Sequence, residues 1–494
     1  MGDHLLVLDE GTTSTRAMLF APDGRCLASE TAPLTQSYPR PGWVEHDAAE
    51  IWRKSLRVTA AMVAQAGGAD RIAAIGITNQ RETVVFWDRK TGEPLAPAIV
   101  WQDRRTAQTC RRLRDAGHEP LVQERTGLLL DPYFSATKIG WALENWPALA
   151  QAGDKLAVGT VDAWLLWKLS GVHATDASNA SRTALLALDG GWDQALLDLF
   201  DIPSKALPNV VDCAGELGRT RTFGGSIPIC GMAGDQQSAA IGQACLTLGI
   251  TKATFGTGAF VLTHAGDVPA RSGHRLLSTV AWQIAGKRHY ALEGSVFVAG
   301  SLVQWLRDGL GLIASAAETE TLARSVSDTA GVYLVPALSG LGAPWWEPDA
   351  RGTLSGFSFA ATKAHVARAA LEAMAYQAAD LQRAFAGDQA PWSGLRIDGG
   401  MVANDWMAQD LADMLALPVE RPRFAETTAL GAAMLAGVGA GIFADLDQAA
   451  AMRGPVDLFQ PSISADQRAA RLAGWQTAVA GVLSASAGPE RTGS

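Results

Sequence analysis

Two stretches that lie far apart in the chain share one pattern: a short apolar strand, a turn rich in glycine and threonine, and a second strand. The first runs from Leu5 to Phe20, with its turn at Glu10 to Ser14. The second runs from Thr251 to Thr263, with its turn at Gly256-Thr257-Gly258. Internal repetition of this kind indicates two lobes of related topology. The pattern therefore predicts an α/β fold of two lobes with a cleft between them.

The length of the chain agrees with this division, because 494 residues exceed one ordinary core. We place an N-terminal domain at residues 1–247, a C-terminal domain at 248–480 and a flexible tail at 481–494. The apolar stretch from Ala429 to Ala444 is shorter than the roughly 20 residues of a bilayer span, so we expect a buried helix there.

Charge and cysteine usage exclude several functions. The net charge is −9 and no Lys/Arg-rich run occurs, which argues against nucleic-acid binding. The N-terminus has neither a secretion signal nor a lipidation motif, so we expect no membrane insertion. The five cysteines form no CxxC pair, which favours reduced thiols and a soluble cytoplasmic protein.

The first turn offers groups that bind an anion. From Asp9 to Arg16, consecutive backbone N–H groups, four hydroxyls and a guanidinium surround Gly11. Asp9, at the end of its strand, is a candidate for holding Mg²⁺ through water. A solvated Asp-Gly hairpin explains the same residues equally well when this segment is considered alone.

The second lobe repeats such groups. Gly256-Thr257-Gly258 has the same character, and a nucleotide clamped between two lobes needs donors from both. After the strand Leu395 to Ile397, Gly399 and Gly400 leave room for a flat ring and Asn404 is placed to donate to it. The alternative for Asn404 is an ordinary helix cap.

Asp235 follows a strand and precedes a helix. Its type and position favour an N-cap, and the functional alternative is a general base for a hydroxyl during phosphoryl transfer. Arg81-Glu82 interrupts another strand. The pair is either solvated or holds vicinal hydroxyls, with Arg81 donating and Glu82 accepting.

Three aromatic residues complete the candidate set. Trp101, Tyr133 and Phe260 are each expected in a hydrophobic core when considered singly. Their alternative use is to wall the carbon chain of a polyol.

Together these residues show that the chain resembles the glycerol kinases of the FGGY carbohydrate kinase family, from about Leu5 to Trp475. The first-lobe motifs are Asp9 to Arg16, Pro41 to Asp47, Gly76 to Thr83, Ile99 to Thr106, Asp131 to Ser135 and Gly234 to Gln237. The second-lobe motifs are Phe255 to Gly258, Gly340 to Pro344 and Asp398 to Gly400.

The resemblance implies two actin/ribonuclease-H-like domains that close on ATP·Mg²⁺ and glycerol, usually within a homodimer or homotetramer. It implies that Asp235 is the catalytic base and that Asp9 and Asp235 are the carboxylates nearest Mg²⁺. The polyol ligands that it implies are Arg81, Glu82, Trp101, Tyr133, Asp235, Gln236 and Phe260. The nucleotide ligands that it implies are Thr12, Thr13, Ser14, Arg16, Thr257, Gly300, Gln304, Gly400 and Asn404.

The chain departs from the family pattern in three places. Glu10 replaces a glutamine, and strand alternation predicts that its side chain points away from the face used by Asp9. The short segment Arg219 to Ser226 has Ser226 where an arginine that binds an inhibitory sugar bisphosphate is expected, which puts that control in doubt. The segment Gly356 to Ala361 replaces a more polar stretch, and no physical reason for this is evident.

Other functions fit less well. A kinase for erythritol or xylulose would need a wider wall than the intact polyol set provides. An actin-like or Hsp70-like ATP-driven binding module would need a further domain or a filament surface, and the chain has no length left for a separate domain. A silent polyol sensor is expected to have lost Asp9 or Asp235, and both are present.

Overall fold

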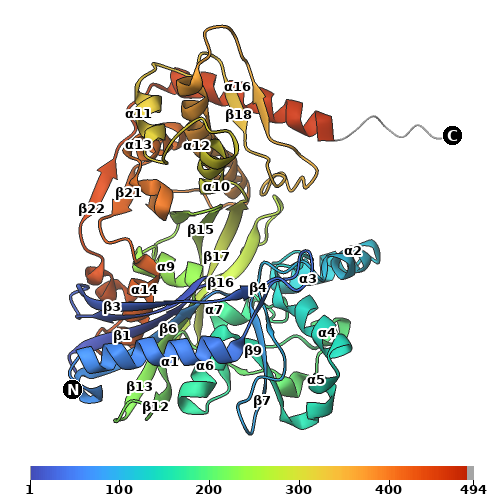
Figure 1. Ribbon diagram of the computed structural model, residues 1–494, viewed down its shortest axis with the longest axis vertical. Helices are drawn as coiled ribbons and strands as arrows, with labels where there is room; N and C mark the ends of the chain where they lie inside the picture. The colour runs from blue at the N-terminus through green and yellow to red at the C-terminus, as the bar shows by residue number, and fades with distance from the viewer. Residues whose placement is uncertain (1, 487–494) are drawn as a thin grey trace, which may run out of the picture.

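The computed structural model describes residues 2–486 and is organised on one sheet of 13 strands (Figure 1). Their order across the sheet is β22-β21-β20-β14-β15-β17-β16-β12-β13-β6-β1-β2-β3. The strands are β1 (His4–Glu10), β2 (Ser14–Phe20), β3 (Cys26–Pro33), β6 (Ile72–Asn79), β12 (Ala214–Thr220), β13 (Ile227–Gly234), β14 (Ile250–Phe255), β15 (Ala259–Gly266), β16 (Leu277–Ile284), β17 (Lys287–Val296), β20 (Gly394–Asp398), β21 (Val419–Pro422) and β22 (Val456–Phe459).

The sheet contains the same five-strand arrangement twice. In the first half of the chain the order is β3-β2-β1-β6-β13, with β1 antiparallel to β2 and parallel to β6. In the second half the order is β17-β15-β14-β20-β21, with β14 antiparallel to β15 and parallel to β20. The two hairpins predicted from the sequence are therefore equivalent strands of two related lobes.

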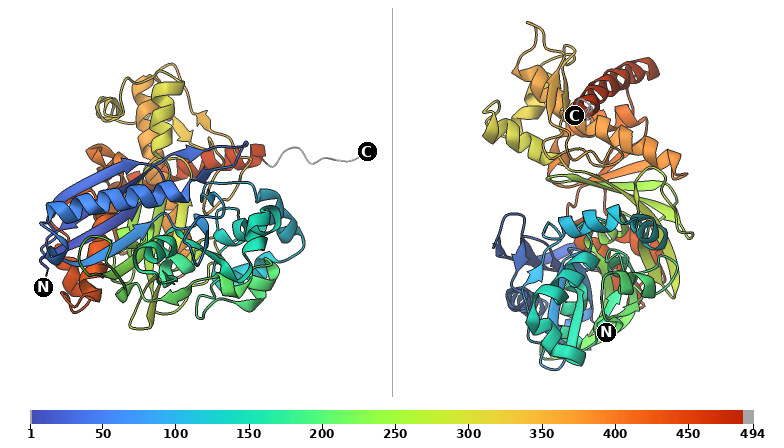
Figure 2. Two further views of the ribbon diagram at one scale, coloured as in Figure 1. Left: turned by 60° about the horizontal axis from the view of Figure 1, so that its bottom comes forward. Right: turned by 90° about the vertical axis from the view of Figure 1, so that its right-hand side faces the viewer.

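The two lobes meet where β12 pairs with β16, in parallel, between Ala214 and Ile284. In the side view of Figure 2 the lobes lie one above the other. The turns that follow β1 and β14 join neighbouring strands of this sheet, and β13 passes directly into helix α9 (Asp235–Gly242).

A second sheet of five strands belongs to the first lobe. Its strands are β4 (Gln36–Ser37), β5 (Glu45–His46), β7 (Val84–Asp88), β8 (Ala98–Ile99) and β9 (Leu156–Thr160). The chain leaves the large sheet after Asn79 and enters β7 at Val84. Arg81 and Glu82 thus lie in the crossing between two sheets, as their interruption of a strand pattern predicted. Two small ribbons pair β10 (Ala174–Asp176) with β11 (Asn209–Val211) and β18 (Tyr333–Val335) with β19 (Thr353–Ser355).

Helices cover both lobes. They are α1 (Ala48–Gln65), α2 (Ala107–Asp115), α3 (Glu119–Thr126), α4 (Ser135–Asn145), α5 (Pro147–Ala152), α6 (Val161–Ser170), α7 (Ala177–Ala180), α8 (Gln194–Leu199), α9 (Asp235–Gly242), α10 (Gly300–Gln304), α11 (Glu318–Arg324), α12 (Lys363–Gly387), α13 (Asp405–Leu415), α14 (Thr427–Gly439), α15 (Leu446–Ala449) and α16 (Ala465–Ser486). Asp47 caps α1 by accepting from the backbone N–H of Ala49, which fixes where this helix begins over β2 and β3.

Helix α14 belongs to the second half of the chain but packs on the first-lobe strands β1, β6 and β13 (Figure 1). Its Met434 and Leu435 share one buried cluster with Leu5 and Val7 of β1. The expected buried helix near Ala429 is therefore present, and it helps to cover the first lobe. A division at residues 247/248 remains our proposal for the two domains, although α14 crosses it in space.

The end of the chain differs from the expectation of a flexible tail at residues 481–494. Helix α16 continues to Ser486, and Trp475, Val479 and Val482 on one face of it are buried against the second-lobe core. Residues 481–486 are therefore helical because an apolar stripe anchors them. The remainder of the expected tail, 487–494, lies outside the described residues. Over residues 2–486, no helix is both long enough and apolar enough to cross a bilayer.

Candidate active site

The first-lobe turn holds its charged groups in a chain of ion pairs. Arg16 pairs with Asp9 across the β1–β2 hairpin at 2.8 Å and with Glu426, which precedes α14, at 2.6 Å. Burial raises the pKa of Asp9, although Arg16 opposes the shift. Thr12, Thr13 and Ser14 form the accessible tip of the turn. Their hydroxyls are therefore open to solvent, and their role in binding an anion stays a prediction.

Glu10 points to the other side of the sheet. It is fully buried and accepts a hydrogen bond from Ser55 Oγ of α1 at 2.8 Å. Burial raises the pKa of Glu10 to about 8, because the hydrogen bonds from Thr15 and Ser55 compensate only in part. At neutral pH this carboxyl is therefore mostly uncharged. Both its orientation and its protonation keep a second negative charge away from the turn.

The second-lobe turn is packed so closely that glycine is required. A side-chain carbon at Gly258 would lie 2.6 Å from the carbonyl oxygen of Val296, and one at Gly300 would lie 2.6 Å from that of Gly256. The backbone N–H of Gly300 donates to the Gly256 carbonyl at 2.8 Å. The start of α10 is thereby joined to the Gly256 turn, and Thr257 remains exposed at its tip.

The segment after β20 contacts the same turn. Gly399 has a φ of +97°, and a side-chain carbon there would lie 2.4 Å from the carbonyl oxygen of Phe255. A side-chain carbon at Gly400 would meet nothing within 4 Å. Gly400 therefore faces open space next to the turn, and the binding of a flat ring there stays a prediction.

Two further predicted nucleotide ligands, Asn404 and Gln304, lie at the ends of helices. Asn404 is the N-cap of α13: its Oδ1 accepts from the backbone N–H of Met407 at 2.9 Å, and its Nδ2 lies 3.4 Å from Thr319 Oγ1. The ordinary cap left open by the sequence is thus present. Gln304 ends α10 with an exposed side chain.

Asp235 is not the N-cap that the sequence pattern favoured. Gly234 occupies the cap position of α9, and Asp235 is the first helical residue. Its Oδ1 accepts from the adjacent backbone N–H of Gln236 at 2.7 Å, and 34% of the side chain remains exposed. Its carboxylate is therefore available to a ligand.

Arg81 joins Asp235 to other predicted polyol residues. Arg81 Nε lies 3.5 Å from Asp235 Oδ1 and 3.6 Å from Glu82 Oε1, and Arg81 Nη2 donates to the Tyr133 hydroxyl at 3.0 Å. Any Cβ at Gly234 would collide with the Arg81 side chain, at 2.7 Å from Cγ. Burial raises the pKa of Asp235 to about 6, against the opposing charge of Arg81. A carboxylate with this pKa accepts a proton near neutral pH.

Two charged residues that the sequence did not indicate complete this group. Glu293, on β17, pairs with Arg81 Nη1 at 2.5 Å, and Arg182 bridges Glu82 and Glu293 at 2.8 Å to each. Burial would raise the pKa of Glu293, but Arg182 and Arg81 outweigh it and hold the pKa at about 2. Both residues lie in segments without a recognisable motif, so only the three-dimensional contact reveals them.

Lys252 is a third missed residue. It is fully buried on β14, and its Nζ donates to the side-chain oxygen of Gln236 at 2.5 Å. Burial lowers its pKa, while Asp398 and Asp235 oppose that shift. Lysine is almost never fully buried unless it is paired. Nothing in the sequence therefore indicated that Lys252 lies in the interior, and only the structure reveals it.

Of the three aromatic residues predicted to wall the polyol, two are in contact with each other and one is not. Trp101 and Tyr133 pack edge to face with ring centroids 5.5 Å apart, and Trp101 Nε1 donates to Thr12. Phe260, on β15, is half-buried. Within residues 2–486, no aromatic contact joins Phe260 to the other two rings. Trp101 and Tyr133 therefore lie together on the first-lobe side. The contribution of Phe260 to a polyol wall stays a prediction.

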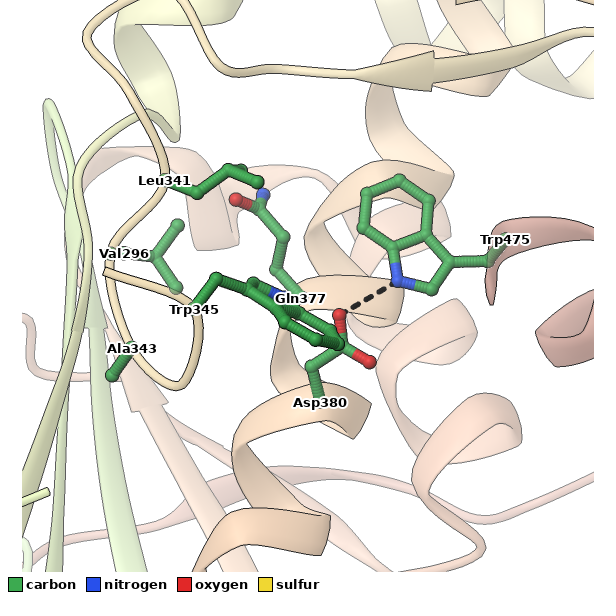
Figure 3. A pocket seen from close by; sticks show the side chains of 8 residues that line it. Val296, Leu341, Ala343, Trp345, Gln377, Asp380 and Trp475 are labelled. Atoms are coloured by element: carbon green, nitrogen blue, oxygen red, sulfur yellow. Dashed lines mark hydrogen bonds between the residues drawn. The ribbon is translucent and has the colours of Figure 1, made fainter. Parts of the chain in front are cut away.

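A small hollow in the second lobe is separate from this group. It has a volume of about 10 Å³ and lies between α12, α16 and the segment around Trp345 (Figure 3). There Trp475 Nε1 donates to Asp380 at 2.8 Å. Its volume holds about one water molecule, and its lining includes no predicted site residue. We regard it as part of the packing that anchors α16.

Comparison with known families accounts for both lobes. Residues 4–242 match the N-terminal domain of the FGGY family of carbohydrate kinases, and residues 251–440 match its C-terminal domain.

The chain belongs to the FGGY family of carbohydrate kinases.

Relatives within the FGGY family extend over nearly the whole chain. A glycerol kinase of Methylobacterium nodulans is 54% identical over 492 residues, which cover 97% of this chain and 98% of the relative. A glycerol kinase of Rhodospirillum rubrum is 53% identical over 97% of this chain and 99% of the relative. The crystal structure of Plasmodium falciparum glycerol kinase with ADP superposes with a TM-score of 0.92 at 34% identity, over 98% of this chain and 99% of that one. The fold is thus the two-domain FGGY kinase fold.

Proposed function

We propose that the protein is a glycerol kinase, which transfers the γ-phosphoryl group of ATP to glycerol and forms sn-glycerol 3-phosphate and ADP. Relatives named glycerol kinase, at 51–54% identity over almost the full chain, support the substrate pair. The structural observation that carries the proposal is the position of Asp235, which is partly open to solvent and lies 3.5 Å from the buried Arg81.

In this proposal Arg81 and Glu82 bind vicinal hydroxyls of glycerol, with the guanidinium donating and the carboxylate accepting. Tyr133 and Gln236 supply further polar contacts, and Trp101 and Phe260 lie against the carbons. Asp235 accepts the proton of the attacking hydroxyl. The hydroxyl oxygen then forms a bond to the γ-phosphorus while the bond from that phosphorus to the β,γ-bridging oxygen breaks, and ADP leaves.

The nucleotide is held from both lobes. Thr12, Thr13, Ser14 and Arg16 are proposed for the phosphates on the first-lobe side, and Thr257 and Gly300 on the other. Gly400, which faces open space, is proposed to approach the adenine ring of ATP, with Asn404 and Gln304 beside it. Closure of the two lobes around the substrates would exclude water, which otherwise competes as the acceptor.

The residues present fit Mg²⁺ held together with ATP. Among the residues described, no group of three or more His, Cys, Asp or Glu side chains is arranged to hold a metal ion. Magnesium needs only one or two carboxylates when phosphates and water complete its shell, and Asp9 and Asp235 are the carboxylates proposed for this role. When bound, Mg²⁺ would neutralise developing charge on the phosphates. Arg16 orients Asp9 through its 2.8 Å ion pair.

The experiment that tests the proposal is an ADP-release assay over glycerol, dihydroxyacetone, erythritol, ribitol and xylulose. We expect glycerol to give the highest kcat/KM and the phosphorylated product to be sn-glycerol 3-phosphate. A higher kcat/KM for erythritol or xylulose would replace glycerol with that substrate. ATP turnover without any phosphorylated polyol would instead favour an ATP-driven binding module.

We also propose a cytoplasmic location, since the reaction consumes ATP and the five cysteines are free thiols. A homodimer or homotetramer is proposed for the assembly. Light scattering on the purified protein tests it.

A further inference from the structure

Arg81 is held by a carboxylate from the other lobe. Glu293 on β17 is 1% exposed, and it contacts Arg81 twice: Nη1 lies 2.5 Å from Oε2, and Nη2 lies 3.2 Å from Oε1. Two contacts to one carboxylate fix the plane of a guanidinium as well as its position. The Nε atom of Arg81 is left directed toward Asp235 and Glu82.

Arg182 holds Glu82, the residue next to Arg81, in the same way. It is fully buried, its Nε donates to Glu82 Oε1 at 2.8 Å, and its Nη2 donates to Glu293 Oε1 at 2.8 Å. The four side chains therefore form a chain of alternating charge, from Glu82 through Arg182 and Glu293 to Arg81. Glu293 and Arg182 are the two interior members, and neither belongs to the predicted polyol ligands.

Stability alone is a poor explanation for this cluster. Burying four charges carries a large desolvation cost, and well-packed apolar residues in place of a buried ion pair are often at least as stabilising. The cluster is explained better by orientation, because its two outer members are the side chains proposed to bind vicinal hydroxyls. A small displacement of such groups misplaces the attacking oxygen.

We infer that Glu293 and Arg182 are positioning residues for the polyol: through Arg81 and Glu82 they set the geometry in which vicinal hydroxyls are bound. This inference rests on the proposed function. The two residues contact the polyol ligands and not the nucleotide turns, so their effect should fall on the polyol.

The test compares three variants with wild type: Glu293→Gln, the double variant Glu293→Gln/Arg182→Gln, and the control Glu372→Gln. Glu372 is also buried within an ion-pair cluster, accepting from Arg368 Nε at 2.9 Å and from the Tyr376 hydroxyl at 2.7 Å, but it lies in the second-lobe core. KM for glycerol, KM for ATP, kcat and Tm are measured for each.

We expect Glu293→Gln to raise KM for glycerol on the order of 10- to 100-fold with KM for ATP within about twofold. The double variant removes one charge of each sign, so we expect it to recover Tm relative to Glu293→Gln while KM for glycerol stays high. Glu372→Gln should lower Tm and leave both KM values unchanged.

Two results would overturn the inference. One is a wild-type KM for glycerol in Glu293→Gln. The other is recovery of Tm and of KM for glycerol together in the double variant, which would mean that the cluster acts only on stability. If wild type prefers another polyol, the proposed function fails separately, and the same comparison of KM values is made with that polyol.

Discussion

The indole Nε1 of Trp101 donates a hydrogen bond to Oγ1 of Thr12 over 2.9 Å. This bond connects the predicted polyol wall to the predicted phosphate turn within the first lobe. Trp101 also packs edge to face on Tyr133, whose hydroxyl accepts from Arg81. The groups proposed to bind the two substrates are therefore in direct contact before either substrate arrives.

Trp101→Phe should weaken binding of both substrates. Phenylalanine keeps an aromatic face for the polyol but removes the donor to Thr12, a loss of about 1 kcal/mol or roughly fivefold in affinity. We expect KM for glycerol and KM for ATP each to rise severalfold in steady-state assays. Trp392→Phe is the control, since Trp392 is a buried core residue whose Nε1 has no partner. A rise confined to glycerol would contradict a shared role for the bond.

Glu10→Gln should stabilise the protein with little effect on catalysis. The pKa of Glu10 is about 8 in the folded protein against an ordinary value of 4.5, so between these values the folded state holds a proton that the unfolded state releases. Stability therefore falls as pH rises through this window, by about 1.4 kcal/mol per pH unit at most. The amide imitates the protonated acid, and the gain in Tm should be larger at pH 8 than at pH 5.

The same variant tests whether the nucleotide senses position 10. We expect KM for ATP to change by less than about twofold, because the side chain points toward Ser55 on the far side of the sheet. A severalfold lower KM for ATP in Glu10→Gln would show that its charge reaches the phosphates.

The pH dependence of kcat should follow Asp235. The carboxyl must be ionised to accept the hydroxyl proton, and burial raises its pKa to about 6. Below pH 6 the group becomes protonated, so kcat at saturating substrates should fall about tenfold per pH unit and should level off above pH 7. A kcat that is constant from pH 5 to pH 8 would exclude Asp235 as the base.

Lys252→Met should act on Gln236 and on Asp235. Methionine fills similar space but removes the Nζ donor that binds Gln236 at 2.5 Å, so KM for glycerol should rise on the order of tenfold. The charge of Lys252 lowers the pKa of Asp235, so its removal should move the acidic limb of kcat upward by about one pH unit. An unmoved limb would show that Lys252 serves only packing.

Local signals in the sequence predicted the turns, because glycine is required where the backbone packs closely, as at Gly258. The β1–β2 and β14–β15 hairpins are present with the expected pairing. The N-cap interpretation of Asp235 was wrong because Gly234 is the N-cap and Asp235 is the first residue of α9, a shift of one residue that patterns cannot resolve. Residues 481–486, expected within a flexible tail, instead continue α16, because Trp475, Val479 and Val482 form a buried stripe along it.

Residues that act through distant contacts were not predictable. Glu293 follows Arg81 by 212 residues and lies on a strand in which no motif marks it as part of a site. Arg182 follows a short helical turn, and Lys252 lies within an apolar strand. Each would be expected at the surface from its type alone. Two exposed aromatic residues on the loop before α12, Phe357 and Phe359, remain without a structural explanation.

The most direct test of the central claim is the rate of sn-glycerol 3-phosphate formation by Asp235→Asn. Binding of glycerol to the variant is first verified by calorimetry, and Asp9→Asn serves as the comparison for loss of a carboxylate on the nucleotide side. We predict that Asp235→Asn binds glycerol and loses on the order of 10²- to 10⁴-fold in kcat, with no acidic limb remaining. A kcat near that of wild type would contradict the assignment of Asp235 as the base.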